Sequence, residues 1–109
     1  MPLRAIPSVE SAPQISAEGS ATIDRCMSDF RTGRVEGLYD LGVAYSTGSN
    51  GLNCDLIEAH KWFNIAAILG HEASTWCRSD VAEEMTAREI ANAQRAAREW
   101  LAANRRKAA

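Results

Sequence analysis

Two histidines and two cysteines are the residues of this chain best suited to hold a metal ion. Cys54, His60, His71 and Cys77 follow one another at intervals of 6, 11 and 6 residues. A structural zinc site needs four such ligands at short and regular spacing. These intervals would instead place them on a turn, two helix ends and a helix. We therefore interpret both histidines as exposed or half-buried polar residues, and we expect no metal and no cofactor.

Cys54 is the best candidate for a nucleophile, because it directly precedes a predicted helix N-terminus, where the helix dipole lowers the pKa of a thiol. Catalysis would also need a neighbouring base. His60 lies more than a turn further along the same helix and is expected to face elsewhere. Glu83 and Glu84 are adjacent on a helix and point about 100° apart, so they do not form an acid/base pair. We therefore predict that the protein is not an enzyme.

Composition and charge limit the remaining classes. The chain has 109 residues, 46% of them hydrophobic, which suits one small domain with a real core. Its net charge of −2 argues against a dedicated nucleic-acid binder. The charge is uneven: residues 35–94 sum to −6 and residues 95–109 to +4. A basic end suits a helix C-terminus, where the dipole favours cations, so we expect no nucleic-acid partner.

The cysteines and the apolar runs indicate a compartment. The three cysteines have no CxxC spacing, and a disulfide framework usually shows an even and denser set. Cys26 and Cys77 are expected to be buried, as small apolar residues. No apolar run reaches the roughly 18 residues of a membrane span, and the first residues lack the apolar core of a signal peptide. We expect a cytoplasmic protein with free thiols and no membrane contact.

Three segments follow one another along the chain. Residues 1–16 are polar, contain all three prolines and lack periodicity, so they are expected to form a flexible N-terminal segment. Residues 17–104 are predicted to form one all-α domain, and residues 105–109 a basic tail. Four or five helices are expected in the domain, over residues 17–32, 35–46, 55–69, 72–85 and 87–104. Capping-box spacings predict the starts of the third and the last of them, at Asp55 with Glu58 and at Thr86 with Glu89.

The two helices between Gly37 and Gly70 have the most informative pattern. In the first, Leu38, Leu41, Gly42 and Tyr45 fall on one helical face. Glycine costs a helix about 1 kcal/mol relative to alanine, so Gly37 and Gly42 indicate close approach of a neighbouring helix. The turn that follows has Gly48 and Gly51 for positive φ angles. The second helix buries a face on which small and large residues alternate, namely Ala59, Trp62, Phe63, Ala66, Ala67 and Leu69.

The same stretch contains a longer motif: Gly37-x-x-x-Leu41-Gly42-x-x-Tyr45-x-x-Gly48, then Asp55-x-x-x-Ala59-x-x-Trp62-Phe63-x-x-Ala66-Ala67-x-x-Gly70. It resembles the Sel-one-like repeat (SLR), a tetratricopeptide-related family common in bacteria. The family's usual alanine is Gly37 here, and its Trp-Tyr pair is Trp62-Phe63. The resemblance implies a short α/α superhelix (solenoid) of about one and a half to two helix pairs, with N- and C-terminal capping helices. It implies an adaptor function and no chemistry.

Two aromatic residues suggest where such an adaptor would bind. Tyr39 and Trp76 lie 37 residues apart, at equivalent positions of the two predicted helix pairs, and Tyr39 lies off the apolar stripe of its helix. In tetratricopeptide-like stacks the first helix of each pair lines a groove, and aromatic residues dominate interface hot spots. The alternative is that Trp76 packs beneath the last helix. The predicted groove residues are Tyr39, Asp40, Val43, Trp76, Asp80 and Glu83.

Two functions remain open from the sequence. The favoured one is a non-catalytic module that binds a protein or peptide in this groove. Because the domain is acidic, we expect a basic or mixed partner with aromatic or aliphatic anchors. The alternative is a self-associating structural module, such as a homodimer, because fewer than about three repeats leave a solenoid's faces uncovered.

Overall fold

The computed structural model describes residues 15–108, and all regular secondary structure in that range is helical. The helices are α2 (Ala17–Arg31), α3 (Glu36–Thr47), α4 (Leu56–Ile68), α5 (Glu72–Ala82) and α6 (Ala87–Ala108). The predicted all-α class is confirmed. Most of the segment expected to be flexible, together with Ala109, lies outside the described residues.

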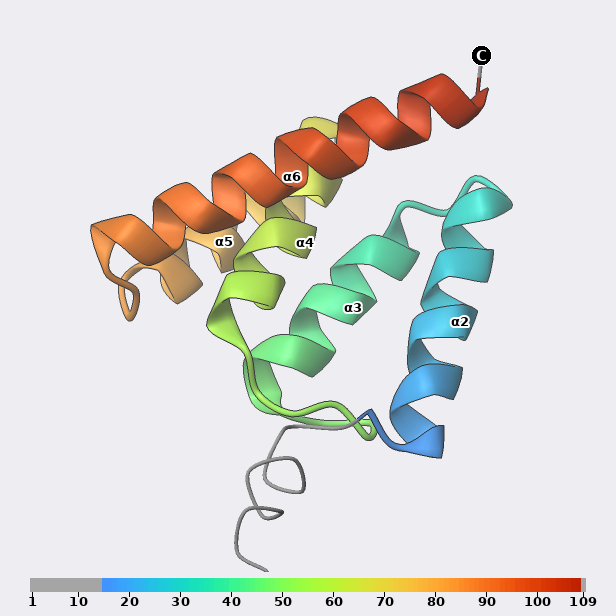
Figure 1. Cartoon of the computed structure of the whole chain (residues 1–109), viewed down its shortest axis with the longest axis horizontal. Coiled ribbons are helices and arrows are strands. Elements are labelled where there is room, and N and C mark those ends of the chain that lie inside the picture. Colours follow the sequence, from blue (N-terminus) through green and yellow to red (C-terminus); the bar gives the residue numbers. More distant parts are fainter. Residues whose placement is uncertain (1–14, 109) are drawn as a thin grey trace, which may run out of the picture.

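The helix α4 is at the centre of the packing. α2 packs on α3 and α3 on α4, so these three lie side by side in chain order (Figure 1). α5 and α6 also pack against α4, and α6 runs across α4 toward the connection between α2 and α3. α4 therefore contacts three other helices, which explains why its sequence is apolar on most sides.

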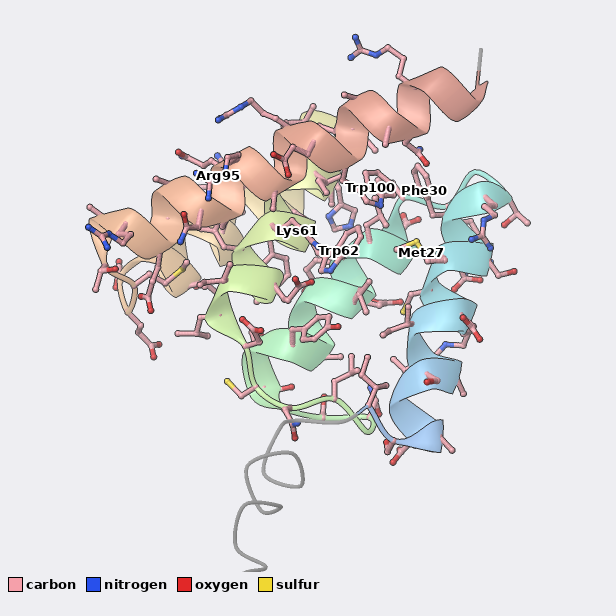
Figure 2. All side chains as sticks on the ribbon, in the orientation of Figure 1. Met27, Phe30, Lys61, Trp62, Arg95 and Trp100 are labelled. Carbon is pink, nitrogen blue, oxygen red and sulfur yellow. The ribbon has the colours of Figure 1, made fainter. Side chains whose placement is uncertain are left out.

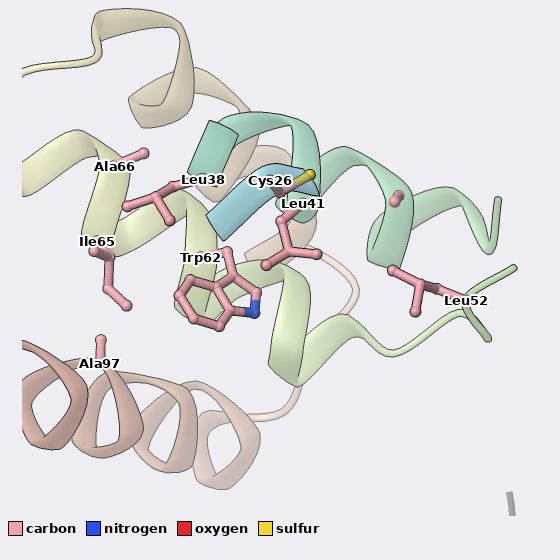
Figure 3. Close-up of a cluster of buried hydrophobic side chains, with 9 residues drawn as sticks. Cys26, Leu38, Leu41, Leu52, Trp62, Ile65, Ala66 and Ala97 are labelled. Carbon is pink, nitrogen blue, oxygen red and sulfur yellow. The ribbon is translucent and has the colours of Figure 1, made fainter. Parts of the chain in front are cut away.

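The larger core cluster centres on Trp62 of α4 (Figure 3). Trp62 is 6% exposed, and its ring meets Trp100 of α6 edge-on, with ring centroids 5.3 Å apart. Trp100 also packs against Phe30 of α2, with centroids 5.7 Å apart (Figure 2). Three aromatic rings thus connect α4, α6 and α2. The other buried members of the cluster are Cys26, Leu38, Leu41, Ala44, Leu52, Ile65, Ala66 and Ala97.

A second, smaller cluster lies between α3, α4 and α5. Its buried members are Ala59, Phe63 and Val81. Cys77 of α5 packs against them and is half-buried, so the burial expected for it is partial. The two clusters cover adjacent sides of α4, since Trp62 belongs to the larger cluster and Phe63, about 100° further round the helix, to the smaller one.

The helical glycines allow close approach, as predicted. A Cβ atom on Gly42 would lie 2.7 Å from the Phe63 ring of α4. A Cβ on Gly37 would overlap the backbone oxygen of Cys26 in α2, and would lie 3.0 Å from the Cβ of Asp29. Gly37 therefore sets the spacing between α2 and α3, and Gly42 the spacing between α3 and α4.

The turn between α3 and α4 adopts the predicted backbone, and α2 is bound to it. Gly48 and Gly51 have φ angles of 68° and 84°. The Thr22 hydroxyl of α2 donates to the Asn50 carbonyl oxygen at 2.8 Å, and the Ser16 hydroxyl to that of Gly51 at 3.1 Å. Side chains at the start of α2 thus satisfy backbone acceptors of a turn that is distant in sequence.

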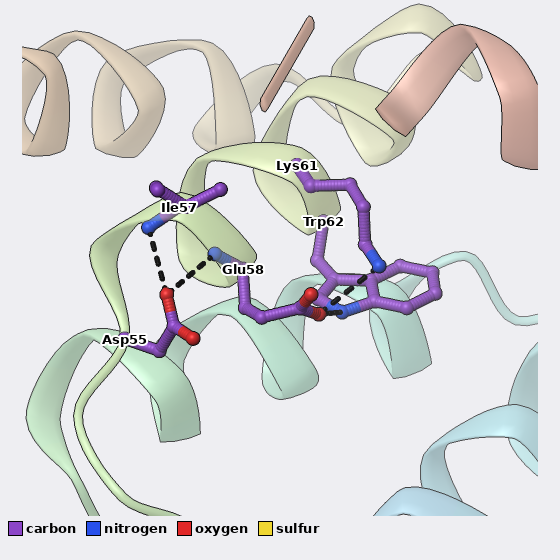
Figure 4. A network of polar contacts seen from close by, with 5 residues as sticks. All are labelled: Asp55, Ile57, Glu58, Lys61 and Trp62. Atoms are coloured by element: carbon purple, nitrogen blue, oxygen red, sulfur yellow. Dashed lines mark hydrogen bonds and ion pairs between the residues drawn. The ribbon is translucent and has the colours of Figure 1, made fainter. Parts of the chain in front are cut away.

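Both predicted caps start their helices, but only one is a complete capping box. Thr86 and Glu89 exchange two hydrogen bonds, of 2.9 and 3.1 Å, as the motif requires. The Asp55 carboxylate accepts from the amides of Ile57 and Glu58, both at 3.1 Å (Figure 4). Glu58 does not return to the Asp55 amide, which donates instead to the Tyr45 carbonyl oxygen. The Glu58 carboxylate instead accepts a hydrogen bond from the Trp62 indole N–H at 3.1 Å.

Two helix ends differ from the prediction. α5 ends at Ala82. The amides of residues 83–85 donate to carbonyl groups three residues back, as in a 3₁₀ turn, and Thr86 then caps the next helix. α6 continues past residue 104 to Ala108, so most of the predicted basic tail is helical. Arg105, Arg106 and Lys107 are good helix formers, and their charge suits a helix C-terminus.

Candidate protein-binding surface

The outer side of α5 has an aromatic residue between carboxylates. Glu72, Trp76, Asp80 and Glu83 are spaced by four, four and three residues, which places them along one side of the helix, and all four are exposed. Trp76 is 74% exposed, more than any other large apolar residue among those described. We call these four residues the Trp76 stripe. Tryptophan is enriched at the hot spots of protein interfaces, so the exposed Trp76 is a candidate contact residue.

The opposite side of α5 explains this orientation. Ser74 and Val81 are buried, and Cys77 packs against the smaller core cluster, to which Val81 belongs. The Arg78 guanidinium donates to the Asn64 side-chain oxygen of α4 at 2.6 Å. Trp76 lies on the other side of the helical circumference from these inward positions and therefore faces away from α4. The alternative that Trp76 packs beneath the last helix is wrong.

The predicted groove residues on α3 have a different role from Trp76. The Tyr39 ring packs against Phe63 and His71, with centroids 5.8 and 4.8 Å apart, so it is half-buried. The charge of Cys77 on α5 is the main cause of the raised pKa of Tyr39, followed by burial. Val43 is likewise half-buried against the smaller core cluster, and Asp40 is exposed. Tyr39 thus meets α5 at Cys77 rather than at Trp76.

All charged side chains of the Trp76 stripe are negative. The stripe contains three carboxylates and no basic residue, while Arg78 of the same helix is bonded to Asn64 on the inward side. A binding surface of this kind favours a basic segment and repels an acidic one.

The burial of His60 was not predicted from the sequence. The residue is 3% exposed, so the expectation of an exposed or half-buried residue is wrong for His60, although His71 is half-buried as expected. The reason is that α5 covers this side of α4. Burial, together with the nearby Arg78 charge, lowers the pKa of His60. Among residues 15–108 its Nδ1 atom has no hydrogen-bond partner.

Acid is expected to destabilise the protein through His60. The unfolded chain takes up a proton on this residue near pH 6.5, its ordinary pKa, whereas the folded chain does so at a lower pH. The stability is therefore fully present above that pH and is lost as the pH falls toward the folded-state pKa. Between the two values the free energy of unfolding should fall by up to about 1.4 kcal/mol per pH unit. Urea denaturation at a series of pH values measures it.

A pair of variants isolates this contribution. His60→Gln should lose much less stability on acidification than the wild type, while His71→Gln, the matched control, should lose as much as the wild type. Equal acid sensitivity of the wild type and His60→Gln would show that His60 does not remain neutral in the folded chain.

A pocket of about 370 Å³ lies beside the turn between α3 and α4. Its polar lining includes Tyr45, whose pKa is raised by burial and then by Glu58 and Asp55. Both carboxylates already have partners. Asp55 caps α4, and Glu58 binds the Trp62 indole and the Lys61 ammonium, the latter at 3.0 Å (Figure 4). The charges beside this pocket therefore stabilise α4.

The thiol and the carboxylates considered as candidates for chemistry are exposed to solvent. Cys54 is exposed at the same pocket, and its Sγ atom lies 3.6 Å from the Ser46 carbonyl oxygen. The Cys54 thiol therefore bonds to a backbone oxygen and not to His60, whose buried Nδ1 atom has no partner in the described range. Glu83 and Glu84 are both exposed, as expected for a solvated face. Within residues 15–108, no group of three or more His, Cys, Asp or Glu side chains is arranged to hold a metal ion.

A second hollow, of about 190 Å³, lies where the C-terminal parts of α2, α4 and α6 meet. It is lined by Phe30, Leu69, Leu101, Asn104 and Arg105, which we call the Phe30 hollow. Leu69 is 44% exposed there. No signal in the sequence predicted this hollow, because its lining comes from three separate helices.

No family model matches the chain, and no characterised protein or solved structure is significantly similar to it. Among the described helices, none is both long and apolar enough to cross a membrane.

Proposed function

We propose that this protein is a non-catalytic interaction module that binds a protein or peptide through the Trp76 stripe, with the α3 residues Tyr39, Asp40 and Val43 as a second contact region. The observation that carries the proposal is the 74% exposure of Trp76 on an otherwise acidic helix face. Burying an exposed indole stabilises a complex strongly, and aromatic residues are enriched at hot spots. The three carboxylates favour a basic or mixed partner segment with an apolar anchor.

The proposal includes the architecture implied by the resemblance to Sel-one-like repeats. One observation supports it: α3 and α4, which carry the motif, pack closely through Gly42 and Phe63. In this reading α2 and the long α6 cover the ends of a minimal α/α repeat. A cytoplasmic, bacterial adaptor role belongs to the same proposal.

Trp76→Ala is the direct test of the function. Proteins captured by the intact chain would be purified, and their affinities for wild type and variant compared. We expect Trp76→Ala to weaken binding by at least about tenfold, since hot-spot truncations cost roughly 2 kcal/mol or more. Thr75→Ala, an exposed neighbour on the same helix, is the matched control and should bind as the wild type does.

The outcome is interpretable only if the variant folds, which circular dichroism and urea denaturation would check. Equal affinities of a purified partner for the wild type and a folded Trp76→Ala would overturn the assignment of this surface.

A further inference from the structure

The molecule has an acidic surface with a projecting indole and, elsewhere, an apolar hollow with a basic residue in its wall. The Trp76 stripe on α5 projects an indole from an acidic helix face. The Phe30 hollow, formed by α2, α4 and α6, is an apolar depression with Arg105 in its wall, and exposed Arg31 lies next to Phe30 in the last turn of α2. The stripe has an exposed aromatic side chain and negative charge, whereas the hollow has an apolar depression and positive charge.

We propose that the Phe30 hollow receives Trp76 from a second copy of this chain, so that molecules associate head to tail. This inference deepens the proposed function, on which it rests, by naming a partner for the Trp76 stripe. In the contact, Asp80 and Glu83 of one copy would face Arg105 and Arg31 of the other.

The size of the Phe30 hollow favours one inserted side chain. Pockets for small ligands usually measure about 300–1,000 Å³. The hollow, at about 190 Å³, is below that range. Phe30, Leu69 and Leu101 give it an apolar floor, which a large aromatic side chain would cover. Ile68 is 56% exposed next to Leu69, so apolar surface continues beyond the hollow and would also be buried.

The charges are consistent with a second copy as the occupant, because the stripe that carries Trp76 is acidic and the wall of the hollow is basic. The Trp76 stripe contains three carboxylates without a basic residue, whereas the exposed Arg105 lines the hollow and the exposed Arg31 follows Phe30 in the chain. Opposite charges on the two surfaces raise the rate of encounter and set the orientation. Because Trp76 remains 74% exposed in the single chain, it does not fill its own hollow.

Head-to-tail contact has a consequence that a symmetric dimer lacks. The two surfaces are different, so each added copy leaves one stripe and one hollow open, and association continues as a series unless the geometry closes into a ring. We therefore expect the wild type to form larger species with rising concentration. Salt should weaken the association, because exposed charge pairs are screened.

A mixing experiment tests the proposal. Trp76→Ala retains the hollow but lacks the anchor, and Leu69→Glu retains the anchor but places a carboxylate in the hollow. In sedimentation velocity each variant alone should be monomeric. The equimolar mixture should form a one-to-one dimer and nothing larger, since only one productive contact remains. Arg105→Glu, in place of Leu69→Glu, should behave in the same way and guards against a folding defect at Leu69.

Three results would overturn the inference: a wild-type chain that stays monomeric up to roughly 1 mM, where even weak contacts are populated; self-association that persists in Trp76→Ala; or a mixture that remains monomeric although both variants are folded. Failure of the proposed function is distinguishable. If the wild type is monomeric while a purified partner still loses affinity for Trp76→Ala, the proposed function stands and only the second copy is excluded.

Discussion

Replacing Trp62 with alanine is expected to lower the free energy of unfolding by about 3–5 kcal/mol, the range for truncating a large buried aromatic side chain. Trp62 is 6% exposed at the centre of the larger core cluster. The substitution removes its edge-on contact with Trp100 and leaves the Glu58 carboxylate without the indole donor. Urea denaturation followed by circular dichroism would measure the loss.

The chain offers a matched control for this experiment. Trp76→Ala removes the same side chain from the surface, where substitutions usually change stability by less than about 0.5 kcal/mol. A loss of similar size for Trp62→Ala and Trp76→Ala would contradict the assignment of one indole to the core and the other to the surface.

Gly37→Ala is expected to destabilise the chain by about 2 kcal/mol, although alanine is the better helix former. The propensity gain is about 1 kcal/mol. Overpacking typically costs 1–3 kcal/mol and occasionally more, and here the added Cβ overlaps backbone, which cannot rotate away. α2 and α3 must therefore separate. The same denaturation measurement applies.

Gly42→Ala is the control that tests whether overlap with backbone causes the loss. The Cβ on Gly42 meets side-chain atoms of the Phe63 ring rather than backbone, so the loss should be smaller than for Gly37→Ala. The opposite order of the two losses would show that the spacing of α2 and α3 is not limited by Gly37.

Much of the fold was predictable because its signals are local. The Thr86–Glu89 capping box and the positive φ angles at Gly48 and Gly51 depend on a few neighbouring residues. Gly42 was informative for a related reason: glycine on an apolar helix face is costly unless another helix lies close. Such patterns predicted the helices and the pairing of α3 with α4.

The candidate site was predicted only in part, because its details depend on where α5 lies. Trp76 and Cys77 are adjacent and both compatible with burial, and a rotation of about 100° decides which of them faces the core. Cys77 faces it, which leaves Trp76 in solvent. His60 was missed for the same reason, since only α5 makes its position on α4 a buried one. The Phe30 hollow needs three helices in place before it exists.

The tryptophans of this chain occupy opposite environments. Trp62 and Trp100 touch each other inside the molecule, and Trp76 is in water. An indole in contact with water emits at longer wavelength than one in apolar surroundings. The native emission spectrum should therefore be the sum of a blue band from the interior and a red band from α5. A contact at α5 changes the red edge, and loosening of the interior changes the blue edge, so one unlabelled sample reports both.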